Sequence, residues 1–157
     1  MRCFRANSFN LIWSEGAIYI AGFEQGLKKW RPYLKQGGYI AVTEISWLTP
    51  PADAPPAIRT FWQEAYPEMA TVDENVKRLT QAGYELVGQF TLPEAAWWAY
   101  YEPLRVRIAT MRKKYAGNTA VLALLEEEEQ EIKLYEQYAE YYSYVFYIGR
   151  VALRPDA

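Results

Sequence analysis

The stretch Phe9–Tyr19 reads FNLIWSEGAIY. Its first part, Phe9–Trp13, is a nearly continuous apolar run, which is typical of a strand that is covered on both faces of a sheet. Its second part places Glu15 beside Gly16, and a glycine allows the backbone to approach a ligand closely. The stretch therefore predicts a buried strand that runs into a loop at the rim of a ligand site.

The residues that follow predict a helix and a second strand. From Phe23 to Leu34, apolar side chains recur at spacings of four, three and four, which indicates a helix with one buried stripe. Gly37 and Gly38 are the expected stop. Residues 39–45 (YIAVTEI) have strong β character. A strand, a helix and a strand in this order form a βαβ unit, so we expect the two strands to be parallel.

The middle of the chain predicts two further helices and a third strand. One helix is expected around Ile58–Tyr66. The next begins at Thr71, because Thr71 and Glu74 have the spacing of a capping box. Gly83 stands where a C-terminal cap belongs. Residues 84–92 then alternate well enough for a strand.

The last third of the chain predicts a helical insertion before a final strand. The pattern is helical over about 94–142, and we expect breaks at Pro103 and at residues 117–118 (Gly-Asn), which gives two or three helices. Residues 144–151 are expected to form the final strand. The elements together predict an α/β fold.

Composition excludes several classes of function. The net charge is −2, so there is no broad basic surface for nucleic acid. The chain has no histidine and one cysteine, which excludes Ser-His-Asp and Cys-His catalysis within it, an internal disulfide and a multi-thiolate zinc site. We expect no metal. Proton transfer would rest on Glu, Asp, Lys or Tyr.

The chain also lacks the sequence features of a membrane protein. No apolar run approaches the roughly 18 residues that span a bilayer, and the N-terminus does not resemble a secretory signal. We therefore expect a soluble cytoplasmic protein with no membrane contact. Aromatic residues make up 17% of the chain. Core packing explains most of them, although such clusters also suit an apolar pocket or an interface.

The order of the elements and four sequence segments carry a resemblance to a known family. The segments are NSFNLIWSEGAIY, LKQGGYIAVTEISW, the helix end Gln81-Ala82-Gly83 and the strand that opens Tyr84-Glu85-Leu86. The chain resembles the C-terminal half of a class I S-adenosylmethionine-dependent methyltransferase, of the ubiquinone/menaquinone methyltransferase-like group. Two positions depart from the family: Asn10 replaces the usual Asp, and Gln36 replaces the usual Pro.

The resemblance implies a partial Rossmann-like fold. Residues 1–157 would form one partial domain that carries strands 4, 5, 6 and 7 of the family's order 3-2-1-4-5-7-6, with flanking helices and the helical insertion before the last strand. The family's glycine-rich cofactor loop and its acidic ribose ligand have no counterpart before Phe9. Strand 9–13 would then lack a neighbour on the side of strand 1, so we expect it to pair there with a second copy or with a separately made N-terminal half.

The resemblance also assigns residues to the cofactor. The loop after strand 4 would lie along S-adenosylmethionine, with Glu15 as the catalytic residue that faces the sulfonium or takes a proton from the acceptor. The cofactor-binding residues would be Trp13, Ser14, Glu15, Gly16 and Ala17. The alternative for Glu15 is a capping role on the helix that follows, and the alternative for Trp13 is ordinary packing.

A second set of residues is implied for the methyl acceptor. Tyr19 would line the cleft, and Glu44 and Trp47 would stand at the end of strand 5, where ordinary loop roles are the alternative. Trp97, Trp98 and Tyr101 belong to the helical insertion, which in this family can lie over the active site. A lid is one interpretation of them, and packing between helices or a dimer contact is the other.

The function implied is methyl transfer from S-adenosylmethionine to a small molecule. Because half of the cofactor site is not recognisable in the sequence, we expect the chain by itself to bind the cofactor weakly or not at all. The alternative is a non-catalytic module for interaction or oligomerisation.

Overall fold

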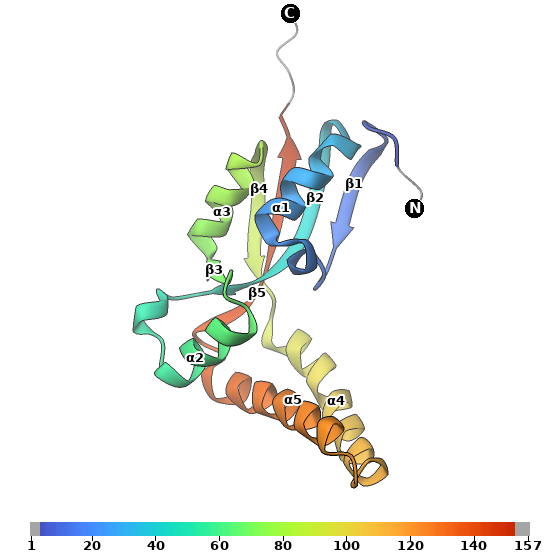
Figure 1. Ribbon diagram of the computed structural model, residues 1–157. Helices are drawn as coiled ribbons and strands as arrows, with labels where there is room; N and C mark the ends of the chain where they lie inside the picture. Colours follow the sequence, from blue (N-terminus) through green and yellow to red (C-terminus); the bar gives the residue numbers. More distant parts are fainter. Residues whose placement is uncertain (1–3, 153–157) are drawn as a thin grey trace, which may run out of the picture. The chain divides into compact units, whose positions relative to one another are not determined.

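The computed structural model describes residues 4–152 and divides into two compact units (Figure 1). The first unit comprises the described residues up to Thr91 together with those from Tyr142 onward, and it contains the sheet. The second unit, Leu92–Tyr141, consists of two helices. The second unit is thus inserted in sequence between two strands of the first.

The first unit alternates strands and helices along the chain. Its regular elements are β1 (Phe9–Ser14), α1 (Phe23–Trp30), β2 (Leu34–Trp47), α2 (Pro56–Ala65), β3 (Ala70–Thr71), α3 (Val72–Gln81), β4 (Tyr84–Thr91) and β5 (Tyr142–Val151). Three short 3-10 helices connect them: η1 (Ile18–Ala21), η2 (Arg31–Tyr33) and η3 (Pro51–Asp53).

The strands form one mixed sheet in the order β1-β2-β5-β4. β1 and β2 are parallel, with Leu11 opposite Tyr39 and Ser14 opposite Val42, which confirms the predicted βαβ unit. β5 runs antiparallel to both β2 and β4. The two-residue β3 pairs with the end of β2, off the main path. The order matches the strands 4-5-7-6 that the resemblance implies, so the predicted fold class is confirmed.

β2 is longer than the predicted strand 39–45, because it begins at Leu34. Gly37 and Gly38 are the expected helix stop, but residues 35–38 lie within β2 and carry an irregularity in the pairing: Phe9 is opposite Leu34, and Leu11 is already opposite Tyr39. Gly37 has a φ of 70°, and a Cβ on Gly38 would lie 2.9 Å from the carbonyl oxygen of Lys35. The two glycines therefore permit a bulge in the strand rather than ending a helix.

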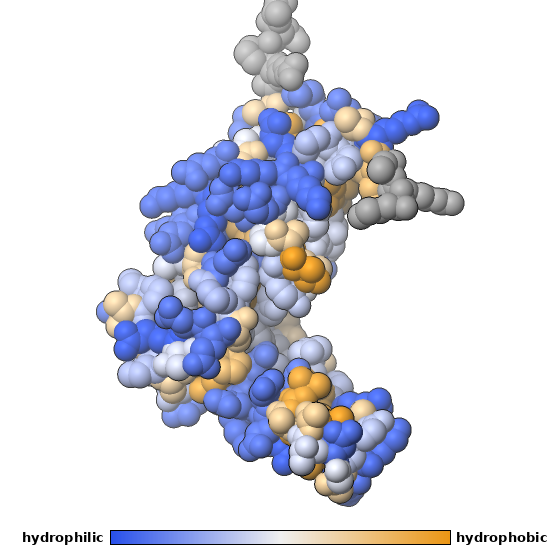
Figure 2. Space-filling model, viewed as in Figure 1, coloured by the Kyte–Doolittle hydropathy of each residue, from blue (hydrophilic) through white to orange (hydrophobic). Residues whose placement is uncertain are grey.

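One face of the sheet is closed by α1 and α3. Its core comprises Ile18, Phe23, Leu27, Leu34, Ile40, Val42, Leu79, Ala82, Tyr84, Val145, Tyr147 and Val151. The predicted capping box starts α3, with Thr71 accepting from the Glu74 backbone and Glu74 accepting from Thr71. Gly83 follows α3 with a φ of 89°, as predicted for a C-terminal cap. The outer surface of these helices is largely hydrophilic (Figure 2).

The other face carries large aromatic and aliphatic side chains that stay exposed. We call this surface the open face and define it by Leu11, Trp13, Tyr39 and Phe90, which are exposed by 48%, 59%, 38% and 49%. Phe146 lies between two of them, 5.0 Å from the Trp13 ring and stacked 5.2 Å from the Phe90 ring. These three rings form an aromatic row that crosses from β1 to β4.

The second unit is a pair of helices, α4 (Glu94–Lys114) and α5 (Thr119–Tyr138). The predicted break at residues 117–118 is present, and Asn118 caps α5 by accepting from the Val121 backbone. The predicted break at Pro103 is wrong, because α4 continues through it. Pro103 removes one backbone donor, but Tyr101 and Ile108 on either side of it are almost fully buried. Packing therefore holds the helix across the proline.

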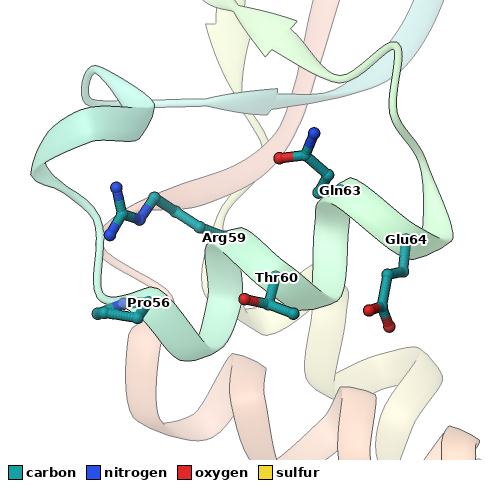
Figure 3. A pocket seen from close by; sticks show the side chains of 5 residues that line it. All are labelled: Pro56, Arg59, Thr60, Gln63 and Glu64. Carbon is teal, nitrogen blue, oxygen red and sulfur yellow. The ribbon is translucent and has the colours of Figure 1, made fainter.

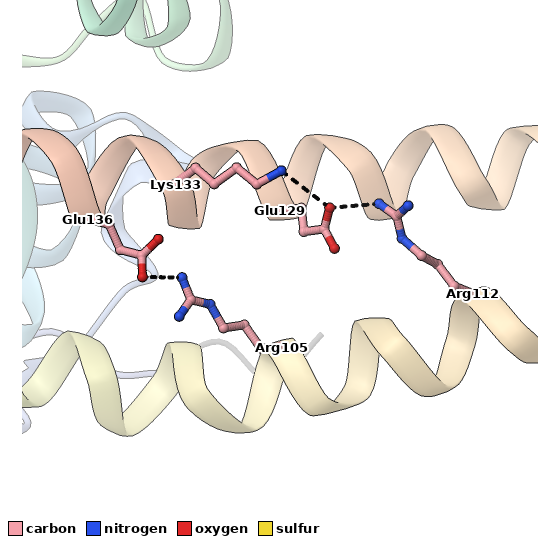
Figure 4. A network of polar contacts seen from close by, with 5 residues as sticks. All are labelled: Arg105, Arg112, Glu129, Lys133 and Glu136. Atoms are coloured by element: carbon pink, nitrogen blue, oxygen red, sulfur yellow. Dashed lines mark hydrogen bonds and ion pairs between the residues drawn. The ribbon is translucent and has the colours of Figure 1, made fainter.

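Ion pairs tie the two helices of this unit together (Figure 4). Arg105 of α4 pairs with Glu136 of α5 at 2.5 Å, and Arg112 pairs with Glu129 at 2.9 Å. Lys133 also approaches Glu129, at 3.7 Å. All of these groups are partly exposed, so each pair is expected to contribute at most about 1 kcal/mol. No helix within residues 4–152 is both long and apolar enough to cross a membrane.

Candidate functional site at the carboxyl ends of β1 and β2

The loop after β1 is fastened to the neighbouring strand through its backbone. The N–H of Gly16 donates to the hydroxyl of Thr43 on β2 at 2.8 Å. Gly16 has a φ of 56°, and a Cβ placed on it would meet nothing within 4 Å. The left-handed backbone explains the glycine at this position. The loop is thereby held at the end of β1 with open space beside it.

Glu15 bonds to Trp13 rather than to the next helix. The indole Nε1 of Trp13 donates to the Glu15 carboxylate at 2.6 Å, and both side chains are exposed. The capping alternative for Glu15 is wrong, because the N-cap of η1 is Ala17 and no side chain bonds there. An exposed aromatic ring and a carboxylate thus lie together at the end of β1, which is an arrangement suited to a cation.

The other residues of the predicted cofactor loop lie at the end of β1 and directly after it. Ser14 is the last residue of β1, and Ala17 is exposed in the loop. Tyr19, in η1, is about half exposed, and its ring lies edge-on to Tyr66 with 6.1 Å between centroids. Ile18 is fully buried in the core, so packing is its role.

Glu44 is a buried carboxyl group near the end of β2. It is only 2% exposed, and the hydroxyl of Tyr66 donates to its Oε1 at 2.5 Å. Burial raises the pKa of Glu44 to about 7, against smaller lowering effects from the Tyr66 hydrogen bond and from Arg78, while Glu68 adds to the rise. Burial and the nearby Glu44 also raise the pKa of Tyr66. The pair can hold and exchange a proton near neutral pH.

A buried polar chain lies next to this pair and joins β2 to α3. The hydroxyls of Ser46 and Tyr147 are 2.8 Å apart, and Asn75 Nδ2 donates to Ser46 Oγ at 3.1 Å. Arg78 in turn donates to Asn75 Oδ1 at 3.2 Å and to the carbonyl of Glu68 at 3.1 Å. Because each polar group has a partner, the chain fixes α3 against the strand that carries Glu44.

Trp47, the last residue of β2, borders a hollow next to Tyr66. Its ring lies edge-on to Tyr142 of β5 at 6.3 Å, and Trp62 of α2 meets the same tyrosine at 5.2 Å. The hollow has a volume of about 220 Å³, and its wall includes Trp47, Trp62, Tyr66 and Met69, with Arg59 also bordering it. A second hollow of about 300 Å³ lies over the polar side of α2 (Figure 3) and shares Arg59.

The three insertion residues that were predicted to contact the acceptor lie in the second unit. The ring of Trp97 stacks on Tyr135 at 4.2 Å, and the hydroxyl of Tyr101 donates to Glu131 at 2.7 Å. Trp98 donates to a carboxylate on its own helix and lies 5.3 Å from the guanidinium of Arg105. They build the packing of the helix pair, and their role as a lid stays a prediction.

Sequence reasoning missed Tyr66, Trp62 and Arg59. Glu44 and Tyr66 are 22 residues apart, and no pattern in the sequence marks that Tyr66, which directly follows α2, reaches β2. The signal that could have found them is the spacing of Arg59, Trp62 and Tyr66, which places them on one face of a helix.

Comparison with known proteins identifies the fold. No protein-family model matches the sequence, and a search of curated proteins gives no match. Solved structures do match. The methyltransferase from Geobacter sulfurreducens in complex with S-adenosyl-L-homocysteine is 16% identical, with a TM-score of 0.70 over 91% of this chain and 58% of that chain.

Two further solved structures show how varied the reactions on this fold are. The [4+2]-cyclase SpnF is 16% identical, with a TM-score of 0.68 over 98% of this chain and 53% of that chain. Geranyl diphosphate C-methyltransferase from Streptomyces coelicolor A3(2) is 13% identical, with a TM-score of 0.59 over 97% of this chain and 50% of that chain.

The chain therefore has the fold of the class I methyltransferases, and it spans little more than half the length of these neighbours. Identities this low establish the fold alone, and one fold supports many reactions.

Proposed function

We propose that this chain is the acceptor-side part of an S-adenosylmethionine-dependent methyltransferase that acts on a small molecule in the cytoplasm. The observation that supports it is the loop after β1, which Gly16 fastens to β2 at the carboxyl edge of the parallel strands. In open α/β sheets ligands bind outside this edge, where the winding reverses. The Geobacter sulfurreducens neighbour, which has the same fold, was solved with the demethylated cofactor.

In this proposal the loop after β1 binds the sulfonium group of S-adenosylmethionine. The ring of Trp13 and the carboxylate of Glu15, joined at 2.6 Å, attract the sulfonium. Ser14, Gly16 and Ala17 offer backbone to the cofactor. Methyl transfer is a direct displacement, so placement of the nucleophile in line with the methyl group, about 3–3.5 Å away, supplies much of the rate.

The acceptor is proposed to lie on the side of Tyr19, Glu44 and Trp47. Tyr19 and Glu44 both contact Tyr66, which links them into one cluster in the first unit. Trp97, Trp98 and Tyr101 of the second unit are proposed as a cover over the acceptor.

We further propose that the donor's methionine and ribose are held by a segment that adds to the free edge of β1. Within residues 4–152, β1 pairs with β2 alone, so its second edge presents unpaired N–H and C=O groups. The solved neighbours are nearly twice as long as the matched region. The added segment could belong to the same polypeptide or to another.

Calorimetric titration of the 157-residue chain with S-adenosylmethionine and with its demethylated product tests this proposal. We expect no binding in the micromolar range from the chain alone. Micromolar binding by a monomer would contradict the incomplete site. If binding appears once a complementary half is added, Glu15→Gln should weaken it, whereas the matched exposed variant Glu85→Gln should not.

A second candidate function is a non-catalytic interaction module, and the open face favours it. Leu11 and Trp13 on β1 and Phe90 on β4 leave a large apolar surface exposed, which in soluble proteins marks a contact site. Under this reading the chain pairs with a second copy of itself. Size-exclusion chromatography with light scattering should then give a dimer that Leu11→Lys converts to a monomer, while Gln25→Lys on the outside of α1 leaves it unchanged.

A further inference from the structure

A surface loop contacts the buried carboxyl group of Glu44. Residues 66–69 connect the end of α2 to β3, and we call them the latch loop. The hydroxyl of Tyr66 donates to Glu44 Oε1 at 2.5 Å, and Glu44 is only 2% exposed. Pro67 and Glu68, next in the loop, are exposed. The group that bonds to Glu44 thus belongs to a surface loop, while Glu44 itself belongs to the central strand β2.

The latch loop is held by a small set of contacts. The N–H of Met69 donates to the carbonyl of Tyr66 at 3.1 Å, and Arg78 of α3 donates to the carbonyl of Glu68 at 3.1 Å. The ring of Tyr66 meets Tyr19 of η1 edge-on at 6.1 Å. By contrast, β2 is held on both sides by ladders of hydrogen bonds to β1 and β5. The loop can therefore open while the strands stay paired.

The groups that face Glu44 do not neutralise its charge. They come from four elements and are Tyr66 at the end of α2, Glu68 in the latch loop, Arg78 of α3 and Tyr147 of β5. Arg78 bonds to a backbone carbonyl and to Asn75 Oδ1, and Glu44 has no ion pair within residues 4–152. Burial raises the pKa of Glu44 to about 7, and this effect exceeds the lowering by the Tyr66 hydrogen bond.

Opening of the latch loop gives the ionised carboxylate access to water. A hydrated glutamate has a pKa near 4.5, whereas Glu44 in the closed form has a pKa of about 7. Loss of the proton to water therefore favours the open form. From these two values the ratio of open to closed loops should rise about tenfold between pH 6 and pH 8, and about 300-fold between the acid and alkaline limits.

We propose that residues 66–69 form a pH-dependent latch, which is closed on Glu44 when this residue is protonated and opens when it is ionised. Opening frees Tyr66 from both Glu44 and Tyr19, so it changes the surface at the carboxyl ends of β1 and β2. The latch needs no ligand, and it operates whether or not the chain transfers a methyl group.

Amide hydrogen exchange of the 157-residue chain tests the latch. The N–H groups of Tyr66 and Met69 are hydrogen-bonded in the closed loop, so their exchange reports its opening. After correction for the intrinsic effect of pH, their protection factors should fall about tenfold from pH 6 to pH 8. Low concentrations of urea separate local opening from global unfolding. Protection in the loop should hardly respond to urea, whereas that of Val42 in β2 should fall steeply.

Variants assign the effect to its residues. Glu44→Gln should make the protection of Tyr66 and Met69 independent of pH, because glutamine does not titrate. Glu64→Gln, an exposed change on α2, is the matched control and should keep the tenfold fall. Tyr66→Phe removes the hydroxyl that holds the loop and should lower the protection of Met69 about fivefold at pH 6. Circular dichroism checks the fold of each variant.

Two results with the unaltered chain would overturn the proposal. One is equal protection of the loop at pH 6 and pH 8. The other is a urea dependence of the loop amides that equals that of Val42, since the loop would then open only when the whole unit unfolds. A tenfold fall that persists in Glu44→Gln would also overturn it, because a different group would then control the loop.

Discussion

The two faces of the sheet in the first unit use alternate residues of the same strands and have opposite surroundings. On one face Ile40 and Val42 of β2 lie under α1 and α3 and are fully buried. On the open face Leu11 and Trp13 of β1 remain about half exposed. Side chains alternate across a strand, so neighbouring residues report on two environments.

The covered face therefore holds the core that stabilises the unit, while the open face leaves apolar side chains available for contact. The helices that cover the first face present a hydrophilic outer side to solvent (Figure 2), as is usual for amphipathic helices on a protein surface. On the open face, by contrast, the two outer rings of the aromatic row, Trp13 and Phe90, are exposed to solvent. The following predictions test the covered face first and the open face last.

The largest expected effect is a cavity on the covered face. Leu79→Ala removes a fully buried side chain of α3 and should lower the free energy of unfolding by about 3 kcal/mol. Leu11→Ala on the open face removes the same atoms from a half-exposed site and should cost less than about 1 kcal/mol. Urea unfolding measures both. Equal losses would mean that the open face is covered in solution.

The second effect is a dependence of stability on pH, centred on the covered face. Glu44 has a pKa raised from 4.5 to about 7 by burial, so between these pH values the folded state binds a proton that the unfolded state has released. The free energy of unfolding therefore falls as pH rises through this window, by about 3 kcal/mol in total. Below pH 4.5 the full contribution of Glu44 to stability is present.

Glu44→Gln should flatten this part of the profile, since Gln does not titrate. Unfolding by urea at pH 5 and pH 8 measures the slope for both proteins. Glu131 in the second unit also has a raised pKa from burial, so some decline should survive in the variant. A slope that is identical in the two proteins would contradict the buried state of Glu44.

A smaller effect is expected at the start of α3. Thr71→Ala removes the hydroxyl that accepts from the Glu74 backbone and should destabilise the covering helix by about 1 kcal/mol. Thr71→Ser, which keeps the cap, is the control. Thermal unfolding followed by circular dichroism distinguishes them, and an unchanged midpoint for Thr71→Ala would show that the capping box does not stabilise the helix.

The smallest effect is expected within the aromatic row. Phe90→Leu removes the ring that stacks on Phe146 but keeps an apolar side chain, so it should cost about 0.5–1 kcal/mol. Val87→Leu, at an exposed position of the same strand, is the matched control. A loss above about 2 kcal/mol in urea unfolding would place Phe90 in a second core and not on an open face.

Most of the fold could be predicted because its signals are local. The capping box of Thr71 and Glu74, the glycine at 83 and the alternation of the strand at 84–92 each depend on neighbours within a few residues. The break at Pro103 was wrong because burial of the surrounding turns outweighs one missing hydrogen bond. The bulge at residues 35–38 was missed because paired glycines mark both helix ends and strand irregularities.

The candidate site was predictable only in part. The resemblance placed Glu15, Glu44 and Trp47 at strand ends. In the structure Glu15 follows β1 directly and Trp47 is the last residue of β2, whereas Glu44 lies inside β2. The bond from Tyr66 to Glu44 joins residues far apart in sequence and depends on how α2 meets the sheet, which no local pattern contains. The packing of Trp97 against Tyr135 likewise follows from the pairing of two helices.

The insertion of Leu92–Tyr141 between β4 and β5 makes that segment exchangeable. β4 and β5 pair with each other, and Thr91 lies opposite Val145, so a short hairpin turn could join them directly. Closing a loop costs entropy only as the logarithm of its length, so replacing fifty residues by five changes that cost by little more than about 2 kcal/mol. Recombination that replaces the Leu92–Tyr141 segment by another is therefore compatible with folding of the sheet.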